Sequence, residues 1–212
     1  MLEANAVYDQ EGAALFAFHD LNYIPFGFSS DEAPYIETPI ATMRAAATLM
    51  GLDNSSDAMA GEKTVVCDLG CGDGDLLISL LRHINTFKTA TPSNAIDSPR
   101  PQATGVGIDY SPALIEAAIL ASEKQAVHVA WRIYDFNADL DDIVNQLLTV
   151  QHVTHVFVYL TPKQLALPTV HNILVGLCKG GVMVCCYKYH PLYLKAARSD
   201  KLMELVVFDA SS

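Results

Sequence analysis

Basic residues are scarce in this sequence: 13 Lys and Arg stand against 24 Asp and Glu, no run of Lys or Arg occurs, and the net charge is −11. A field of this sign repels phosphate backbones and disfavours nucleic-acid partners, whereas it attracts a basic protein or another cationic substrate. Long apolar runs are also lacking, since no stretch reaches the ~18 residues of a membrane-spanning helix. The composition, 51% hydrophobic and 17% charged, fits a globular protein.

The five cysteines lack the spacing of a metal site, and the seven histidines are scattered without ligand spacing. We interpret the cysteines as buried free thiols in a reducing compartment, and we expect no metal and no histidine base. The first twenty residues contain no Lys or Arg, unlike a secretion or mitochondrial signal. We therefore expect a cytoplasmic protein.

The most informative stretch is 64–75, TVVCDLGCGDGD. A short apolar strand runs into Asp68, three alternating glycines follow, and the apolar pattern of a helix begins at Leu76. Open α/β sheets use such a strand–turn–helix unit to hold a nucleotide at their carboxyl edge. The pattern is G-x-G-x-G behind an acid and differs from the dinucleotide-binding G-x-G-x-x-G. Taken alone, it also fits a tight turn without a ligand.

The N-terminal part is rich in aromatic residues up to Tyr35, which suggests a segment that packs over something. Thr38 is the predicted N-cap of a helix that has Pro39 as its first residue and Gly51 as its stop. We expect residues 1–60 to form an N-terminal cap segment and helix, and residues 61–212 to form the main domain.

Strands and helices alternate in the rest of the chain. The predicted strands are 105–109, 127–134, 153–160, 182–188 and 202–209, and the predicted helices are 76–84, 112–119, 140–147, 168–177 and 192–198. Such alternation predicts an α/β fold, an open, doubly wound, mainly parallel sheet with helices on both faces and an N-terminal helical cap. The Pro-, Ser- and Thr-containing segment Thr89–Gln102 is expected to be a surface insertion.

Asp109 ends the second strand of the main domain, where a carboxylate can accept hydrogen bonds from both ribose hydroxyls of a nucleoside. It follows Gly74 by 35 residues, against the usual separation of ~20, and the insertion accounts for the excess. A role as N-cap of the next helix is the alternative, but Ser111 already fills that position.

Asp135 and Phe136 follow the third strand. The carboxylate could accept the exocyclic amine of adenine, and Phe136 offers a backbone N–H and an apolar face. A turn residue is the simpler reading of Asp135 alone. Together with Asp68 and Asp109, however, Asp135 places an acid at three successive strand ends, which favours a nucleoside pocket.

The segments VVCDLGCGDGDLL, GVGIDYSP, IYDFNADL and VFVYLTPKQL resemble the successive motifs of class I, seven-β-strand methyltransferases that depend on S-adenosylmethionine, over roughly residues 63–188. The segments APYIETP and ELVVFDA, with the Leu-Thr-Pro after strand four, resemble a protein-lysine-methylating branch. That branch includes the enzymes acting on ATP-synthase subunit c and on the adenine nucleotide carrier. The strand-four end lacks the Asn-Pro-Pro-Tyr of amide and adenine methylases, which argues against DNA or glutamine as the acceptor.

This resemblance implies a Rossmann-like fold and a set of cofactor-binding residues: Tyr35, Thr38, Asp68, Gly70, Gly72, Gly74, Asp109, Tyr110, Asp135 and Phe136. By the resemblance, Asp68 reaches the methionyl ammonium, the glycines let the backbone lie against the methionine part, and Asp109 holds the ribose. Tyr110 lies beside the adenine, Asp135 and Phe136 bind the base, and Tyr35 and Thr38 close over the cofactor.

Methyl transfer from a sulfonium is an in-line displacement that needs no metal. Its main requirements are near-attack geometry and exclusion of water, which together contribute up to ~7–11 kcal/mol. Tyr159 and Leu160 are the predicted catalytic pair, at the place where the acceptor amine meets the methyl group. The ring of Tyr159 could hold a cation, or the residue could be a core aromatic.

The sequence therefore predicts an N-methyltransferase that acts on a protein lysine. A small-molecule methyltransferase, with the aromatic N-terminal segment closing its pocket, is the alternative within enzymes. A cofactor-binding partner subunit without catalysis is the third reading. The acceptor and the oligomeric state stay open.

Overall fold

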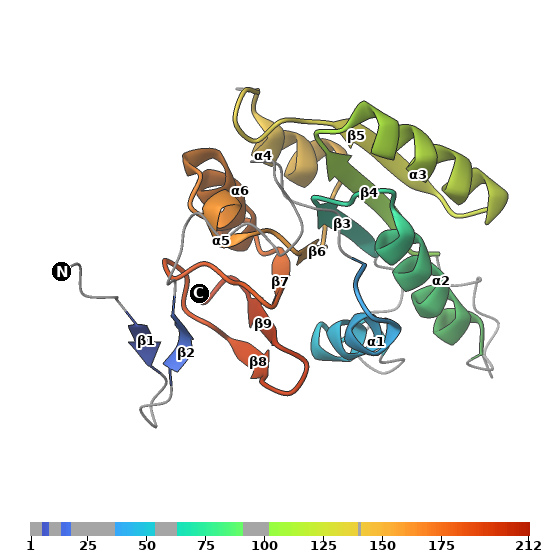
Figure 1. Cartoon of the computed structure of the whole chain (residues 1–212). Helices are drawn as coiled ribbons and strands as arrows, with labels where there is room; N and C mark the ends of the chain where they lie inside the picture. Colours follow the sequence, from blue (N-terminus) through green and yellow to red (C-terminus); the bar gives the residue numbers. More distant parts are fainter. Residues whose placement is uncertain (1–5, 9–13, 18–36, 54–62, 91–101, 140) are drawn as a thin grey trace.

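The structure, a computed structural model, describes residues 6–8, 14–17, 37–53, 63–90, 102–139 and 141–212 (Figure 1). Its strands are β1 (Ala6–Tyr8), β2 (Ala14–Ala17), β3 (Val65–Leu69), β4 (Thr104–Asp109), β5 (Val129–Ile133), β6 (His155–Val158), β7 (Met183–Tyr187), β8 (Arg198–Asp200) and β9 (Leu205–Phe208). Its helices are α1 (Ile40–Leu49), α2 (Asp75–Ala90), α3 (Pro112–Lys124), α4 (Ile143–Asn145), the π-helix η1 (Gln146–Val150), α5 (Pro162–Leu165) and α6 (Pro168–Lys179).

Seven strands form one sheet in the order β5-β4-β3-β6-β7-β9-β8, and β1 and β2 form a separate antiparallel pair. Strands β5, β4, β3, β6 and β7 are parallel, whereas β9 runs antiparallel to β7 and to β8. The predicted open, doubly wound, mainly parallel sheet is thus confirmed. The chain moves from β3 outward through β4 to β5 and then returns to β6 on the other side, so β3 and β6 flank the switch point where open α/β sheets bind ligands.

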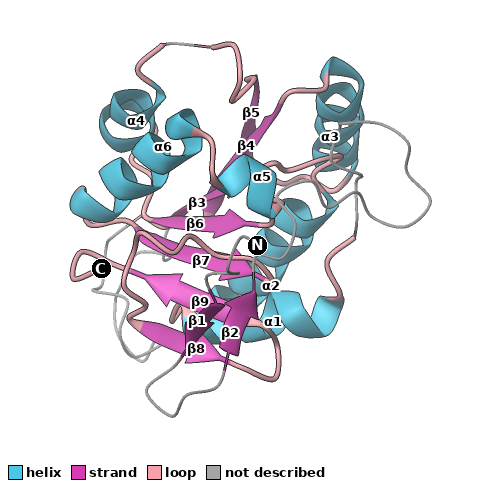
Figure 2. Ribbon diagram, turned by 60° about the vertical axis from the view of Figure 1, so that its left-hand side comes forward, coloured by secondary structure: helices cyan, strands magenta, loops and turns pink. Residues whose placement is uncertain are grey.

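Helices cover both faces of the sheet (Figures 1 and 2). On one face, α1 and α2 bury apolar side chains such as Ala46 and Leu80 against Phe157 and Val207 of the sheet. Helix α3 joins this layer, since the indole N–H of Trp131, which packs on the same face, donates to Ser122 of α3 at 3.0 Å. Helices α4, α5 and α6 and the π-helix η1 bury the opposite face.

Helix α1 therefore belongs to the layer that covers the sheet, with Met43, Ala46 and Ala47 in the same core cluster as α2 and β9. The expected domain boundary near residue 60 lies outside the described residues, so the division into 1–60 and 61–212 stays a prediction. None of the helices in the described ranges has both the length and the apolar character that crossing a lipid bilayer requires.

The ends of α1 differ in how well they were predicted. The N-cap prediction for Thr38 is wrong by one residue: Pro39 is the N-cap, in an extended conformation, and its carbonyl accepts the N–H of Met43 at 3.0 Å without any side-chain cap. The stop at Gly51 is confirmed. Gly51 has φ +74° and donates to Thr48, while Leu52 donates to Ala47, the hydrogen bonds of a Schellman motif.

Two further predictions need correction. The helix expected over 192–198 does not form, because Ala197 donates to Val207 and the next residues pair with β9 as strand β8. The strand expected over 127–134 is limited to β5, an edge strand whose Ile133 is 53% exposed, while Tyr134, after the strand, is 1% exposed. The chain leaves the sheet after Ile133, so the predicted alternation of buried and exposed side chains does not extend to Tyr134.

All five cysteines are buried and free, as expected. Burial raises the pKa of Cys178 to about 11 and that of Cys185 to about 12, so these thiols stay protonated at neutral pH.

Candidate cofactor and acceptor site

The pairing register fixes which residues share the carboxyl edge of the sheet. Asp68 of β3 pairs with Gly107 of β4 on one side and with Phe157 of β6 on the other. Side chains alternate between the faces of a strand, so the residues two positions further along face the same side, that of α1 and α2. Across the sheet, this edge row consists of Asp109, Tyr159 and Tyr187, and Gly70 lies between Asp109 and Tyr159 just beyond the end of β3.

The edge row has a gap at Gly70. The φ of Gly70 is +82°, a conformation that favours glycine, and an added Cβ would point to the opposite side of the sheet, 2.8 Å from Cδ2 of Leu160. Gly72 and Gly74 also have positive φ, +56° and +79°. The backbone N–H groups of Gly70 and Cys71 donate to the carbonyl of Ile108, so the loop is fastened to β4. The glycine pattern therefore has a conformational cause in this chain.

Asp109 connects two loops of the site. Its Oδ2 accepts the N–H of Gly72 at 3.0 Å, and its Oδ1 accepts the N–H of Ser111 at 2.9 Å. Each carboxylate oxygen has a second lone pair, so two further hydrogen bonds, such as those of a ribose diol, remain chemically possible. Ser111 caps α3 by accepting the N–H of Leu114, as predicted.

Asp68 is buried, with 4% of its surface exposed, on the same side of the sheet as Asp109. Burial raises the pKa of Asp68 to about 8, and the neighbouring Asp109 carboxylate adds to this shift. A cation placed beside this pair would offset both effects and favour the ionised form.

Trp131 supports the glycine loop from below. An added Cβ would lie 2.4 Å from its ring at Gly74 and 2.1 Å from it at Gly107. The two glycines thus leave room for an indole that crosses β4 and reaches Ser122. This role was not predicted from the sequence. A usable signal was present, because the only tryptophan of the chain lies in the predicted strand that follows the strand containing Gly105-Val106-Gly107.

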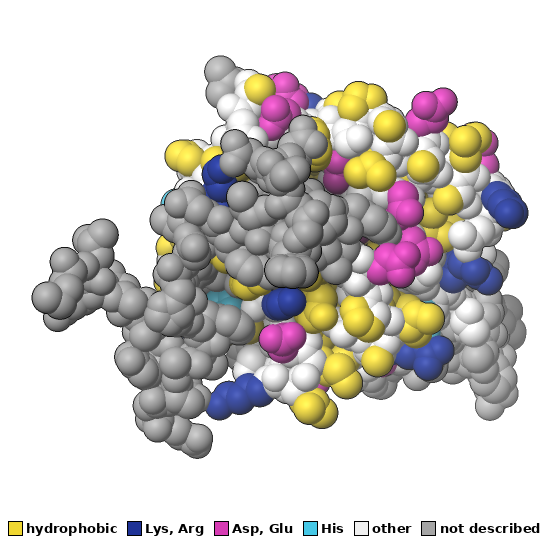
Figure 3. All heavy atoms as spheres, viewed as in Figure 1, with side chains coloured by type: hydrophobic (Ala, Val, Ile, Leu, Met, Phe, Trp, Pro, Cys, Tyr) yellow, Lys and Arg dark blue, Asp and Glu magenta, His cyan; other side chains and the backbone are white. Residues whose placement is uncertain are grey.

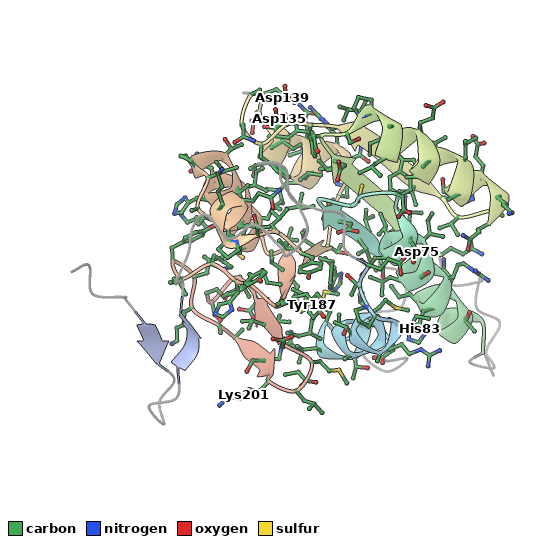
Figure 4. The ribbon with its side chains drawn as sticks, viewed as in Figure 1. Asp75, His83, Asp135, Asp139, Tyr187 and Lys201 are labelled. Atoms are coloured by element: carbon green, nitrogen blue, oxygen red, sulfur yellow. The ribbon has the colours of Figure 1, made fainter. Side chains whose placement is uncertain are left out.

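Asp135 and Phe136 lie in the loop after β5. Asp135 accepts the backbone and side-chain N–H groups of Asn137 through Oδ1, and its own N–H donates to Asp139. Figure 4 shows Asp135 and Asp139 side by side on this loop. The ring of Phe136 is buried in the core at 5.8 Å from that of Tyr134, so its apolar face contributes to packing. Base binding by these two residues stays a prediction.

The remaining predicted residues are distributed around this edge. Tyr110 follows Asp109 and is 43% exposed, and Thr38 is half-buried just before α1. Leu160 is buried against the glycine loop, whereas Tyr159 is half-buried on the opposite side of the strand. Tyr35 lies outside the described residues.

Sequence reasoning also missed Tyr187, at the end of β7. Its ring contacts that of Tyr159, with centroids 4.7 Å apart and planes at 57°. Figure 4 shows Tyr187 at the tip of β7, near the middle of the sheet edge. In the space-filling view of Figure 3, acidic side chains gather near the start of α2, where Figure 4 labels Asp75. The edge of the sheet thus combines acidic groups with two tyrosine rings.

The model of a methyltransferase domain family matches residues 60–189, more than half of the chain. The chain belongs to this methyltransferase family. The matched range contains the glycine loop, Asp109, Asp135 and both tyrosines of the edge row. No curated protein matches the sequence of this methyltransferase significantly.

Solved structures share the fold of this methyltransferase. It is similar to the RNA methyltransferase from Salinibacter ruber in complex with S-adenosyl-L-homocysteine, with 21% identity and a TM-score of 0.53 over 82% of this chain and 91% of that one. WbdD, crystallised with a kinase inhibitor, has 16% identity and a TM-score of 0.51 over 78% of this chain and 40% of its own. An S-adenosylmethionine-dependent methyltransferase from Thiobacillus denitrificans has 18% identity and a TM-score of 0.42 over 68% of this chain and 47% of its own. This methyltransferase spans less than half of the last two proteins. The predictions of a Rossmann-like methyltransferase fold and of a methyltransferase are confirmed.

Proposed function

We propose that this enzyme transfers the methyl group of S-adenosylmethionine to the side-chain nitrogen of a protein lysine. The observation that carries the proposal is the edge row, in which a carboxylate, a gap without side chains and an aromatic residue follow one another across β4, β3 and β6. An adenosine with a methylated sulfur has the matching sequence of groups: a ribose diol, a sulfonium and a transferable methyl.

The cofactor would lie across the switch point with its ribose hydroxyls on Asp109. The backbone of Gly70 and Gly72 would then pass beside the methionine part, where glycine allows close approach. Asp68 would accept the methionyl ammonium and lose its proton as this cation arrives. The crystallisation of the Salinibacter ruber enzyme with S-adenosyl-L-homocysteine, on the same fold, supports this choice of cofactor.

The chemical step is a displacement at carbon. The lone pair of a neutral amine attacks the methyl carbon, the carbon–sulfur bond breaks, and its electron pair goes to sulfur. The methylated nitrogen then carries a positive charge and a proton that it gives to solvent. A free lysine side chain has a pKa of ~10.4 and is almost fully protonated at neutral pH, so it has to give a proton to solvent before its nitrogen can attack. The residues of this chain mainly contribute orientation and exclusion of water.

A lysine acceptor agrees with the charge of the protein. The net charge of −11 attracts cationic partners and repels phosphate backbones. The tyrosine at the end of β6 gives the acceptor an aromatic neighbour of the kind that binds ammonium groups.

Labelling of a cell lysate with S-adenosylmethionine that carries a radioactive methyl group tests the acceptor. We expect wild-type enzyme to label a discrete protein band whose acid hydrolysate contains methyl-lysine, and Asp109→Ala enzyme at equal concentration to label it far less. Label found only in the small-molecule fraction would favour the small-molecule reading, and label in RNA would overturn the protein acceptor. Tight cofactor binding without any label would favour a partner subunit.

A further inference from the structure

Tyr159 and Tyr187 form a two-ring corner beside the gap of the edge row. Tyr159 follows β6 and Tyr187 ends the adjacent parallel strand β7, each two residues beyond the paired residues Phe157 and Cys185, which are buried in the core. Both tyrosines are half-buried and pack against the cluster under α1 and α2. One side of each ring therefore rests on the core.

The geometry of the corner suits a cation. With the ring planes at 57° and the centroids 4.7 Å apart, the rings are tilted and are not stacked face to face. Two rings tilted in this way can both face one ammonium within ~6 Å of their centroids, the range in which aromatic rings attract such groups. A single ring would give about half of this attraction.

The backbone holds Tyr187 in place through an unusual turn. Lys188 and Glu204 both have positive φ, +65° and +54°, although neither is glycine. The N–H of Lys188 donates to the carbonyl of Glu204 at 2.7 Å, and the N–H of Tyr189 donates to the carbonyl of Tyr187 at the same distance. Non-glycine residues in this region are uncommon, and such conformations cluster at functional sites. The Lys188 ammonium itself lies over the ring of Tyr189, 5.9 Å from its centroid.

The charges along the row point to the same kind of ligand. Asp68 and Asp109 lie on the same side of the sheet as the two tyrosines, one and two strands away from β6. The Asp109 carboxylate disfavours an anionic or phosphorylated acceptor and favours a cationic one, whereas the charge of Asp68 is offset by the methionyl ammonium in the proposed complex. The two rings lie on the far side of the glycine gap from the residue proposed to hold the ribose, where the transferable methyl would point.

We infer that Tyr159 and Tyr187 together bind the ammonium of the acceptor, which then gives a proton to solvent so that the neutral amine can attack the methyl group. The substrate class is therefore a cationic, and in later rounds methylated, amine. This inference rests on the proposed methyl transfer. Methylation enlarges the ammonium and keeps its charge, so the corner would bind the mono- and dimethylated acceptors as well as the unmodified amine.

Two ligands of the same shape test whether the corner binds a cation. Choline and 3,3-dimethylbutan-1-ol have the same shape and differ by one positive charge. Both are titrated by NMR or calorimetry into enzyme saturated with S-adenosylhomocysteine, whose sulfur is neutral and leaves the charge of the acceptor site unchanged. We expect choline to bind about tenfold more tightly than the neutral alcohol, the size of a two-ring cation–π preference.

Substitutions of the two tyrosines test whether these rings cause the preference for choline. Tyr187→Leu and Tyr159→Leu should each lose most of the preference for choline, Tyr187→Phe should keep it, and Tyr193→Leu, which changes a partly exposed tyrosine in contact with His171, should leave it unchanged. Equal binding of both probes to the wild type, or an undiminished preference in both Leu variants, would overturn the inference. If a Leu variant fails to fold, the wild type and Tyr187→Phe still decide, because both must prefer choline.

Binding of S-adenosylhomocysteine separates this inference from the proposed function. Enzyme that binds S-adenosylhomocysteine but does not distinguish the two probes would refute the corner alone. Enzyme that does not bind S-adenosylhomocysteine at all would refute the proposed function on which the corner depends.

Discussion

At the scale of single residues, Asp109 has a structural role, since it accepts the N–H groups of Gly72 and Ser111. We propose that it also binds the ribose diol. A carboxylate held by two backbone donors is oriented before the ligand arrives, which reduces the cost of ordering it on binding.

Replacing Asp109 with Ala should therefore weaken the binding of S-adenosylhomocysteine by roughly 1.5–3 kcal/mol, the range of hydrogen bonds to charged groups, or about 10- to 150-fold. Calorimetric titration of wild type and variant measures this. Asp75→Ala is the matched control, because Asp75 is an exposed acid in the first turn of α2 that the proposal does not use. An unchanged affinity in Asp109→Ala would refute the ribose assignment.

Because the pKa of Asp68 is raised in the folded protein, we expect the stability to depend on pH. Its pKa is raised from 3.8 to about 8 in the folded protein, so between these values the unfolded chain ionises Asp68 while the folded chain keeps it protonated. The free energy of unfolding of the ligand-free protein should therefore fall as the pH rises from about 4 to 8, by on the order of 1 kcal/mol per pH unit from this group.

The variant Asp68→Asn isolates the contribution of this group. Its free energy of unfolding should depend less on pH, so that it becomes more stable than the wild type near pH 8, while its affinity for S-adenosylhomocysteine falls. Denaturant unfolding of both proteins at several pH values between 4 and 8 is the measurement. Parallel pH profiles for the two proteins would contradict the assigned shift.

At the scale of elements, the glycine loop depends on what lies beneath it. Gly107 of β4 has no side chain, and the ring of Trp131 occupies the space that a Cβ would fill. The indole in turn reaches α3 through its hydrogen bond to Ser122. One aromatic side chain thus joins β5, β4, the loop and α3.

Gly107→Ala should destabilise the protein by about 1–3 kcal/mol, the usual cost of overpacking a core. The cost should be smaller when Trp131 is replaced by Leu, because the clashing ring is then absent. A double-mutant cycle of Gly107→Ala and Trp131→Leu, followed by denaturant unfolding, measures the coupling. Additive free energies would show that the two sites are independent and would contradict the packing argument.

Helix α5 begins two residues after Leu160, at Pro162, and Thr161 caps it in a capping box. The hydroxyl of Thr161 accepts the N–H of Gln164, and the Gln164 side chain accepts the N–H of Thr161. This reciprocal cap fixes the direction in which the chain leaves the acceptor side of the site.

Thr161→Ala should lower the free energy of unfolding by about 0.5–2 kcal/mol, the usual cost of losing an N-cap, and should reduce methyl transfer more than cofactor binding. Thr149→Ala is the control, because the exposed Thr149 hydroxyl donates to Asn145 within its own turn. Equal effects of the two variants on stability and on methyl transfer would argue against the role of the cap.

At the scale of the whole molecule, the sequence predicted the features that depend on local conformation. The glycine loop was predictable because three positions need positive φ, and the sheet was predictable because apolar strands alternate with capped helices such as α3. Contacts between residues that are far apart in the sequence were not predictable. Gly107 with Trp131, and Tyr159 with Tyr187, are neighbours only through the register of parallel strands. The failed helix over 192–198 has the same cause, since its backbone finds partners on β9.

The central claim is that the carboxyl edge of this sheet binds S-adenosylmethionine across the switch point. The most direct measurement is a calorimetric titration of S-adenosylhomocysteine into the wild-type protein at pH 7, repeated in buffers with different enthalpies of ionisation. The account predicts one cofactor per chain and release of a proton on binding, because Asp68 ionises beside the methionyl ammonium. Absence of binding would contradict the account, and binding without proton release would contradict the place given to Asp68.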